Sequence, residues 1–551
     1  MSSADRKRFV FVFLGLFVLC FVLFQFGNSN VGLTDPDDVF YADTAKEMLS
    51  HHSWLVPIMF GQPQFEKPPL YYWLLMLSFQ LFGVTAFAAR VVGEVVGFAG
   101  VIGTFLFVRK FIGEREGLLS AIILATSIWW IGLSRVVLTD LLFSVLIMFA
   151  LYSFLAWHKD RRSVWLSAFG VCTALATLAK SPLGLFLPIL VIVVFLLIQK
   201  EYGSIKDFLL SHWWILYVVI AAPWYVYVTV LFRYQFVWEF FIHDHWHRLL
   251  MAEHPEFNKW YFYFAAVGFG FIPWTPYILF LKGSLKSARP YGLFLVIWIV
   301  VMGLFFGFAQ SKLTTYISPI YPAMAILVAL GITEVKPTRG LKIITGGLLI
   351  VLAAGLGAGA TVVASKYPEL ASPALVTFGA LAVVLLISGV LMLAGRVVYS
   401  VMASAGGVVL FALLAATIVF GRLEQGLTQS NLIPLMSRYD YAGKPLLCSK
   451  LFVRGAFFYT GNPVVVMADN QQPFWSNHPV PIISSDTAIS DFVQSRDTLV
   501  GVLSGGDLAR LTRLCPSTAR IDTVMSDMGK TIVVCYLHPQ VSTAEQAISE
   551  K

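Results

Sequence analysis

The sequence predicts a helical protein that crosses a membrane many times and ends in a small α/β domain. Hydrophobic residues make up 58% of its 551 residues and charged residues only 13%, whereas an ordinary soluble domain has about 25% charged residues. The apolar residues lie in about thirteen unbroken runs, each near the roughly 20 residues that a spanning helix needs. After residue 420 the composition becomes polar. These features exclude a soluble enzyme and a disordered chain, and the unbroken runs exclude a transmembrane β-barrel.

The apolar runs define the predicted spans along the first 420 residues. They cover 9–27, 88–108, 117–133, 137–157, 164–180, 183–199, 212–232, 261–281, 291–309, 316–334, 342–364, 374–395 and 400–420. The first run is long and lacks an A-x-A cleavage site, so we interpret it as a retained anchor rather than a cleaved signal peptide. The stretch 69–83 is shorter, and we expect it to lie along the membrane surface as an interfacial helix.

Basic residues between the runs predict which side of the membrane each loop occupies. The formal net charge is +8, and the Lys and Arg residues gather in alternate short loops. The positive-inside rule therefore predicts a cytoplasmic N-terminus and a C-terminal region on the outer side. We interpret the positive charge as a topology signal and expect no nucleic acid partner. In bacteria, the corresponding location is the inner membrane with a periplasmic C-terminal domain.

The predicted organisation has two domains. Residues 1–420 form the transmembrane domain, with two long outer loops at 28–87 and 233–260. Residues 421–551 form the soluble α/β domain, with strand-like runs at 464–467, 498–503 and 531–537 and a helix at 507–514. This domain contains Cys448, Cys515 and Cys535. They allow one disulfide and leave one thiol over, and their pairing stays open.

The first outer loop contains the sequence T-D-P-D-D-V-F-Y-A, from Thr34 to Ala42. A carboxylate just outside a membrane can act as a general base on an acceptor hydroxyl. Alternatively, Asp35 or Asp37 caps the helix that begins near Asp38.

The same loop continues with F-E-K-P-P-L, from Phe65 to Leu70. Pro68 and Pro69 fix an extended turn, which holds Lys67 at the interface, where it can bind a phosphate as a point charge. The alternative is a lysine that extends its charged end from the membrane into water.

Three further segments place polar groups at the predicted outer face. The second loop contains H-x-H-x-H at His243, His245 and His247, which together with Glu66 can bind zinc or simply form a polar interfacial loop. The segment S-K-L-T-T-Y, ending at Tyr316, suits a phosphate at a helix start or an interfacial tyrosine. Lys180 either binds the phosphate or closes the turn between two spans.

Three glycines, Gly355, Gly357 and Gly359, superficially suggest a nucleotide-binding loop. Such a loop needs a preceding strand and a βαβ unit. These glycines lie inside a predicted span, where we expect them to serve close helix packing.

The motifs occur together in one order: D-D-x-x-Y-A, F-E-K-P-P-L, L-T-D at Asp140, D-H-W-H-R and S-K-L-x-x-Y. In this combination the chain resembles the bacterial aminoarabinose transferases that modify lipid A. More broadly it resembles the protein O-mannosyltransferase-like membrane glycosyltransferases of the GT-C fold. The resemblance covers residues 1 to about 335 well, and beyond that only in layout.

The resemblance implies transfer of a sugar from a polyprenyl-phosphate donor at the outer face of the cytoplasmic membrane. The catalytic carboxylate corresponds to Asp37, with Asp140 as a supporting polar residue. The donor-phosphate contacts correspond to Lys67, Tyr316 and Lys180. Glu66 and His245 match positions that can hold a zinc ion, and no other cofactor is implied.

One position departs from the family pattern. In aminoarabinose transferases the first motif resembles D-E-G-R-Y-A, and its arginine helps to bind the donor phosphate. The corresponding residue here is Phe40, which cannot form a bidentate phosphate contact. The sequence therefore predicts the reaction class but neither the donor sugar nor the acceptor, which is lipid A or another glycan or protein.

The predicted reaction is an inverting displacement, in which Asp37 activates an acceptor hydroxyl and polyprenyl phosphate leaves beside Lys67. Two alternatives stay open. A protein O-glycosyltransferase would use the same chemistry on another acceptor. A transporter or flippase of a lipid-linked substrate would need polar or broken helices near the midplane, whereas the charges here lie toward one face.

Overall fold

The computed structural model describes residues 3–252, 255–281, 291–334, 336–468 and 480–537. Within these ranges the chain forms two compact units. The first contains residues 1–29, 53–57 and 65–420, and the second contains residues 30–52, 58–64 and 421–551. Half of the predicted first outer loop, residues 30–52 and 58–64, therefore belongs to the same unit as the C-terminal domain, whereas the sequence placed all of 28–87 with the spans.

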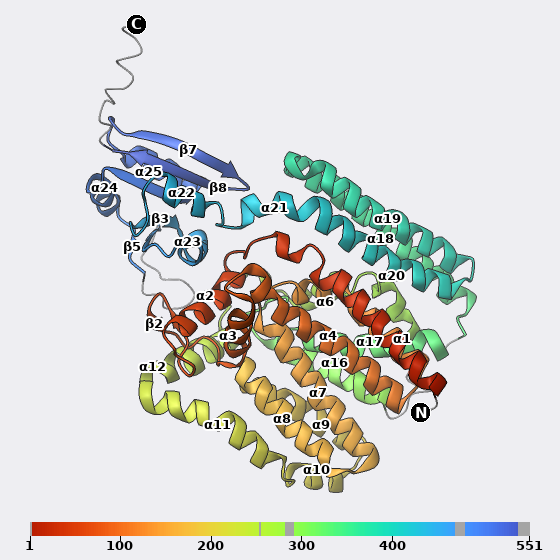
Figure 1. The fold of residues 1–551 in the computed structure, drawn as a ribbon. Helices are drawn as coiled ribbons and strands as arrows, with labels where there is room; N and C mark the ends of the chain where they lie inside the picture. Colours follow the sequence, from red (N-terminus) through yellow and green to blue (C-terminus); the bar gives the residue numbers. More distant parts are fainter. Residues whose placement is uncertain (1–2, 253–254, 282–290, 335, 469–479, 538–551) are drawn as a thin grey trace. The chain divides into compact units, whose positions relative to one another are not determined.

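In its described residues, the first unit consists of helices and the loops that join them (Figure 1). Its longer helices are α1 (Ser3–Cys20), α3 (Leu70–Phe82), α4 (Ala86–Phe111), α5 (Glu114–Ala125), α6 (Ile128–Ser134), α7 (Thr139–Asp160), α8 (Ser163–Ala179), α9 (Leu183–Ile198), α10 (Tyr202–Leu209), α11 (Trp213–Phe232), α14 (Phe262–Gly270), α16 (Tyr291–Phe308), α17 (Tyr321–Glu334), α18 (Arg339–Lys366), α19 (Ala371–Leu393) and α20 (Val397–Leu414). A π-helix at Val237–His247 lies between the short helices α12 (Tyr234–Phe236) and α13 (Arg248–Leu250). Helix α7 is buried along most of its length and packs against α8, α4 and α9.

In the described residues, eight helices are long and apolar enough to cross a membrane, or nine if the bent pair α5 and α6 forms one span. The predicted count of thirteen spans is not confirmed. Several apolar runs fold as shorter apolar helices, such as α8 with 17 residues and α9 with 16. The run 117–133 is bent by 66° between α5 and α6. The run 261–281 is also divided, because Pro273 follows α14 and cannot donate a helical hydrogen bond.

The short stretch 69–83 forms α3, which has 13 residues. At 1.5 Å per residue it extends roughly 20 Å, less than the roughly 30 Å hydrocarbon core of a bilayer. Tyr71, Tyr72 and Leu75 are buried, while Leu77 and Leu81 are exposed. The exposed face of α3 is also largely apolar, and its position along the membrane surface stays a prediction.

Helices α18 and α19 pack closely through glycines that the sequence analysis did not select. A Cβ atom added at Gly389 would lie 2.7 Å from Cγ1 of Ile350, and one at Gly346 would lie 2.9 Å from the carbonyl oxygen of Gly389. In contrast, a Cβ at any glycine of the group 355, 357 and 359 would meet open space within 4 Å. The expectation that this group serves close helix packing is therefore wrong.

The second unit contains a six-stranded sheet in the order β5-β4-β3-β6-β8-β7. Its strands are β3 (Leu446–Ser449), β4 (Val464–Met467), β5 (Ile482–Ile483), β6 (Thr498–Ser504), β7 (Arg520–Asp527) and β8 (Lys530–Tyr536). The first four in spatial order are mutually parallel, and β8 runs antiparallel to both of its neighbours, β6 and β7. The three predicted strands and the predicted helix, α25 (Gly505–Leu514), agree with the structure to within two residues.

Helices cover both faces of this sheet. On one face, alternate strand residues pack against α22 (Leu432–Arg438) and α23 (Val453–Thr460). On the other face, the intervening residues pack against α24 (Asp486–Gln494) and α25. The unit also contains α2 (Asp37–Ser50) and a small hairpin of β1 (Ile58–Met59) and β2 (Gln62–Pro63).

The cysteines of this domain are free thiols. Cys448 is buried on the face that packs against α22 and α23, whereas Cys515 and Cys535 belong to the hydrophobic cluster on the opposite face. The sheet therefore separates Cys448 from the other two.

Candidate functional site

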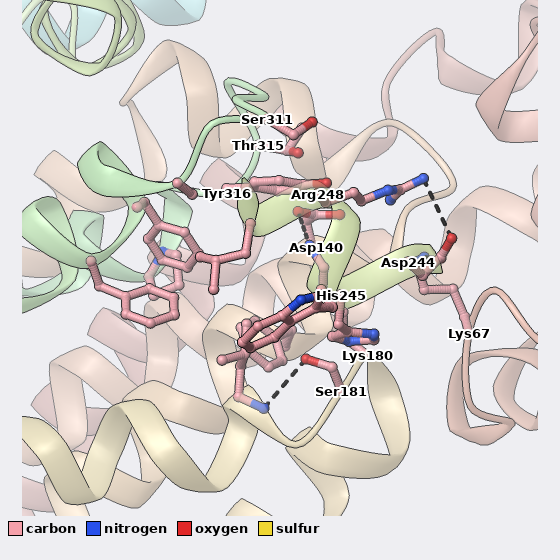
Figure 2. A pocket seen from close by; sticks show the side chains of 18 of the residues that line it. Lys67, Asp140, Lys180, Ser181, Asp244, His245, Arg248, Ser311, Thr315 and Tyr316 are labelled. Atoms are coloured by element: carbon pink, nitrogen blue, oxygen red, sulfur yellow. Dashed lines mark hydrogen bonds and ion pairs between the residues drawn. The ribbon is translucent and has the colours of Figure 1, made fainter. Parts of the chain in front are cut away.

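A cavity of about 420 Å³ lies in the first unit, where several segments far apart in the sequence meet (Figure 2). Lys67 precedes α3, Asp140 lies in the first turn of α7, and Lys180 follows α8. The π-helix and α13 contribute Asp244, His245 and Arg248, and the segment before α17 contributes Ser311, Thr315 and Tyr316. The structure thus brings together five of the seven predicted site residues: Lys67, Asp140, Lys180, His245 and Tyr316.

One end of the polar lining is an ion pair between two helix termini. Lys180 Nζ lies 2.6 Å from Oδ1 of Asp140. It also lies 4.4 Å from the ring centroid of Tyr316, close enough for a cation–π contact. Asp140 is placed at the N-terminus of α7, where the helix dipole favours a negative charge.

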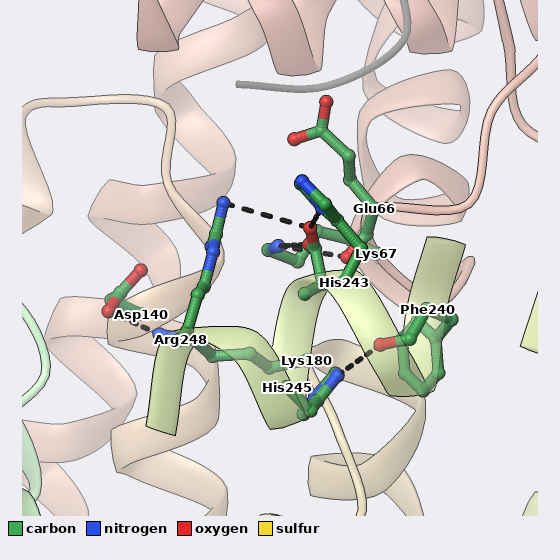
Figure 3. A network of polar contacts seen from close by, with 9 residues as sticks. Glu66, Lys67, Asp140, Lys180, Phe240, His243, His245 and Arg248 are labelled. Carbon is green, nitrogen blue, oxygen red and sulfur yellow. Dashed lines mark hydrogen bonds and ion pairs between the residues drawn. The ribbon is translucent and has the colours of Figure 1, made fainter. Parts of the chain in front are cut away.

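The other end is a buried carboxylate among cationic side chains. Asp244 is 6% exposed, and its Oδ2 lies 3.1 Å from Nζ of Lys67. Its Oδ1 lies 3.7 Å from Nη2 of Arg248 and 3.2 Å from Nδ1 of His243 (Figure 3). Burial opposes the charge on Asp244, but Lys67 and Arg248 outweigh it and hold the pKa of this carboxyl well below its usual range.

The charges of the lining do not balance. Among the described lining residues, the basic side chains are Lys67, Lys180 and Arg248, and the carboxylates are Asp140 and Asp244. One cationic charge is therefore in excess in a partly closed space, where electrostatic attraction is stronger than in water. An anion is the ligand that this charge distribution favours.

The rest of the cavity is apolar. It is lined by Phe143, Leu183, Phe241, Leu249, Phe305 and Phe306. A cavity with a cationic end and an aromatic and aliphatic wall suits an amphipathic molecule with an anionic head.

The histidine in the cavity is neutral at physiological pH. Its Nδ1 donates a hydrogen bond to the carbonyl oxygen of Phe240 at 2.5 Å. Burial lowers the pKa of His245 to about 4, so Nε2 carries a lone pair. A backbone hydrogen bond at Nδ1 is the arrangement that metal-binding histidines use.

The predicted zinc partner lies elsewhere. Figure 3 shows the carboxylate of Glu66 pointing away from His245. Among the described residues, no group of three or more His, Cys, Asp and Glu side chains is arranged to hold a metal ion. The arrangement does not fit a zinc ion shared by Glu66 and His245.

Comparison with known proteins identifies the family. A family model described as dolichyl-phosphate-mannose-protein mannosyltransferase matches residues 66–227. An uncharacterized protein of Aquifex aeolicus is 31% identical over 363 residues, which are 63% of this chain and 68% of that protein. The undecaprenyl phosphate-alpha-4-amino-4-deoxy-L-arabinose arabinosyl transferase 1 of Proteus mirabilis is 27% identical and is matched over 67% of each chain. The crystal structure of ArnT from Cupriavidus metallidurans bound to undecaprenyl phosphate has a TM-score of 0.78 at 22% identity, with 96% of this chain and 98% of that chain covered.

This chain belongs to the GT-C membrane glycosyltransferases. The likeness to ArnT extends across both units, so the C-terminal domain is part of the shared fold. The resemblance found in the sequence motifs is confirmed.

The segment of this glycosyltransferase that contains Tyr316 differs from the expected helix start. Helix α17 begins at Tyr321, and Tyr316 lies in a turn whose backbone N–H bonds to the carbonyl of Leu313. Lys312 is directed to other partners, because its Nζ donates to Asn258 Oδ1 and to the carbonyl of Ala309. Tyr316 therefore contributes a ring to the cavity rather than a helix N-terminus.

Asp37 belongs to the second unit, where it is the first residue of α2 and is exposed. Helix α2 has Pro36 at its N-cap and no side-chain capping bond. The capping interpretation of Asp35 and Asp37 is therefore wrong. The catalytic role of Asp37 stays a prediction.

Asp244 and Arg248 were among the polar residues expected at the outer face, but the sequence suggested no role for them in the site. Both occur in D-H-W-H-R, where the histidines were weighed as metal ligands instead. Their i, i+4 spacing was a signal that they could form an ion pair. The sequence could not show that Lys67, 177 residues away, would join them.

Proposed function

We propose that this glycosyltransferase transfers a sugar from a polyprenyl-phosphate donor to lipid A or another cell-surface acceptor. The observation that carries the proposal is the excess of cationic charge at one end of an otherwise apolar cavity. A polyprenyl phosphate has the matching chemistry, with a hydrocarbon chain and an anionic head. Relatives named as undecaprenyl-phosphate aminoarabinose transferases support the same donor class.

The phosphate of the donor binds beside Lys67, Arg248 and Lys180. Lys67 and Arg248 already share a carboxylate, Asp244, so their charges converge on one point. The ion pair with Asp140 holds Lys180 in place, and the Tyr316 ring supports its ammonium group. These cations stabilise the negative charge that develops on the leaving phosphate.

The chemical step is an inverting displacement. Asp37 accepts the proton of the acceptor hydroxyl while that oxygen attacks the anomeric carbon of the sugar. The bond from the anomeric carbon to the phosphate oxygen breaks, and polyprenyl phosphate leaves with the electron pair. A donor that is already a lipid phosphate suits an enzyme of the bacterial inner membrane that acts at the periplasmic face, where nucleotide sugars are not supplied.

The donor sugar is not assigned to aminoarabinose. In the motif of the aminoarabinose transferases, an arginine occupies the position that corresponds to Phe40 in this chain. The acceptor also stays open between lipid A, another glycan and a protein.

The test measures both the product and donor-lipid binding. Mass spectrometry of lipid A, surface glycans and membrane proteins is compared between cells with the wild-type gene and cells with Asp37→Asn. We expect one sugar modification to disappear with the variant while the protein still inserts. Full modification by Asp37→Asn would overturn the assignment of the base.

Binding is measured on purified protein in nanodiscs with undecaprenyl phosphate as the probe. Lys67→Gln removes a charge-assisted hydrogen bond, which corresponds to about a tenfold to hundredfold loss of affinity. Lys259→Gln is the matched control, because Lys259 is exposed and outside the cavity. Equal affinities of the two variants would overturn the proposed phosphate site.

A further inference from the structure

The loop that carries Asp37 is built into the C-terminal sheet domain. Several contacts join it to residues some 400 positions later in the sequence. They pair Gly32 N with Glu424 Oε2 at 2.6 Å, Leu33 N with Tyr459 Oη at 2.5 Å and Lys46 Nζ with the Phe458 carbonyl at 2.7 Å, and a β-bridge joins Thr34 to Thr428. The backbone on both sides of Asp37 is therefore fixed by this domain.

Asp35 makes the most specific of these contacts. Its Oδ1 accepts a hydrogen bond of 2.8 Å from the backbone N–H of Gly455, and its Oδ2 accepts one of 3.2 Å from Nε2 of Gln429. Gly455 lies in the first turn of α23, where N–H groups lack helical partners and the helix dipole favours an anion. Asp35 thus occupies the anion-binding end of a helix in its own chain.

The contact requires a glycine at position 455. A Cβ atom there would lie 2.1 Å from Oδ2 of Asp35 and 2.5 Å from Cγ of Gln429. Both distances are shorter than a non-bonded contact of a carbon atom, so any larger residue at position 455 displaces Asp35 from α23. Position 455 therefore needs glycine because the missing side chain leaves room for those of Asp35 and Gln429. The backbone conformation does not require it.

The neighbouring residue of α23 holds the other side of the same turn. Arg454 Nη1 donates to the carbonyl of Pro36 at 3.3 Å, and its guanidinium carbon lies 4.7 Å from the ring centroid of Phe40. Pro36 precedes Asp37 and Phe40 follows it by less than one helical turn. Helix α23 therefore contacts the chain immediately before and after Asp37.

We propose that Asp35 is a positioning residue, through which the C-terminal domain sets the location and orientation of the Asp37 carboxylate. This inference rests on the proposed function, because it assumes that Asp37 is the base. Misplacing a reacting group by about 1 Å can cost roughly a hundredfold in rate. Loss of the Asp35 contact should therefore impair turnover without impairing donor binding, since the cations of the cavity belong to the other unit.

The test uses the full-length protein in nanodiscs and compares Gly455→Ala with Gly506→Ala. A methyl group at Gly506, in the first turn of α25, meets open space. We expect Gly455→Ala to lower the rate of product formation about tenfold to hundredfold and to leave the affinity for undecaprenyl phosphate within about twofold. Gly506→Ala should match the wild type in both measurements.

Two further measurements separate positioning from general loss of folding. Hydrogen exchange of the segment 32–50 should become faster in Gly455→Ala and stay unchanged in Gly506→Ala. Asp35→Ala removes both hydrogen bonds without adding volume and should lower turnover in the same way. Asp35→Asn should restore most of the activity, because an amide oxygen still accepts from Gly455 and the Gln429 amide can rotate to accept from its NH2 group.

The outcomes are distinguishable. Wild-type turnover in both Asp35→Ala and Gly455→Ala would overturn the positioning role while leaving the proposed function intact, provided that Asp37→Asn is inactive. An active Asp37→Asn would overturn the proposed function itself. If Gly455→Ala fails to fold, Asp35→Ala decides: a loss of undecaprenyl-phosphate binding equal to its loss of turnover would also overturn the inference.

Discussion

Lys180 and Asp140 form an ion pair of 2.6 Å between the C-terminal end of α8 and the first turn of α7. Both side chains are largely buried and line the same cavity. The pair therefore links the packing of two core helices to the charge of the proposed phosphate site. In the proposed site, a bound phosphate would therefore share Lys180 with Asp140.

Removing one partner of this pair should destabilise the protein more than removing both. Asp140→Asn leaves a largely buried ammonium group without its counter-ion, and such a change costs about 3–5 kcal/mol in typical cases. The double variant with Lys180→Met should recover part of that loss. Thermal unfolding of the single and double variants tests this. The exposed pair Arg520–Asp522 is the control, where we expect less than about 1 kcal/mol.

Replacing Asp244 should strengthen binding of a lipid phosphate. Asp244→Asn removes a carboxylate that competes with the phosphate for Lys67 and Arg248. We expect a severalfold higher affinity for undecaprenyl phosphate and a steeper loss of affinity with added salt. Titration of the purified variants at two salt concentrations measures both effects. Weaker binding by Asp244→Asn would mean that this carboxylate holds the cations in place rather than competing for them.

Asp35 should make the stability of the protein depend on pH. Burial raises the pKa of its carboxyl to about 7, although Gln429, Gly455 and the cations Arg454 and Lys530 lower it. A carboxyl whose pKa is higher in the folded state contributes stability that is complete below its unfolded pKa. That stability is lost as the pH rises through the folded value. We therefore expect the melting temperature to fall between about pH 4 and pH 7.

The variant Asp35→Asn should flatten this part of the pH profile. Asp43 contributes with the same sign, because burial also raises its pKa, so a smaller slope should persist. Burial lowers the pKa of Lys530 to about 8, which places its titration above the window. Melting curves from pH 4 to pH 8 compare the two proteins. Identical slopes would show that Asp35 does not titrate in this range.

The contact between α18 and α19 should tolerate no side chain at Gly389. Gly389→Ala forces a methyl group against Ile350 and Gly346, and overpacking of this kind costs about 1–3 kcal/mol. Gly379→Ala lies on the same helix and meets open space. Its stability should be unchanged or slightly higher, because alanine favours a helix over glycine. Thermal unfolding in detergent compares the two, and equal melting temperatures would contradict the packing argument.

The elements of the C-terminal domain were predictable because their signals are local. Buried strands such as 464–467 are short apolar runs of β-branched residues, and the structure confirms them. The count of spans was not predictable in the same way. The predicted runs 117–133 and 164–180 have the same length, yet the first became the bent pair α5 and α6 and the second became the single helix α8. Apolar composition alone does not show which run is broken.

The candidate site was predictable in part. Lys67, Asp140, Lys180 and Tyr316 were found from motifs, and they line one cavity. Asp244 was given no role in the predicted site, because its contact with Lys67, 177 residues away, does not follow from the spacing of the motif. The carboxylate of Glu66 points away from His245, its predicted partner. The surrounding fold sets the direction of each side chain, and the sequence does not show it.

The amino-acid sequence by itself determined the membrane class, the α/β character of the tail, the family and most of the polar residues that line the cavity. Composition and short motifs contain this information, since hydrophobic burial and charge chemistry act through residue type. Only the tertiary structure decided which cations meet at Asp244, and that the Asp37 loop folds with the C-terminal domain through Asp35 and Gly455. These relationships join residues up to 420 positions apart, and such pairings arise from long-range packing rather than from local sequence.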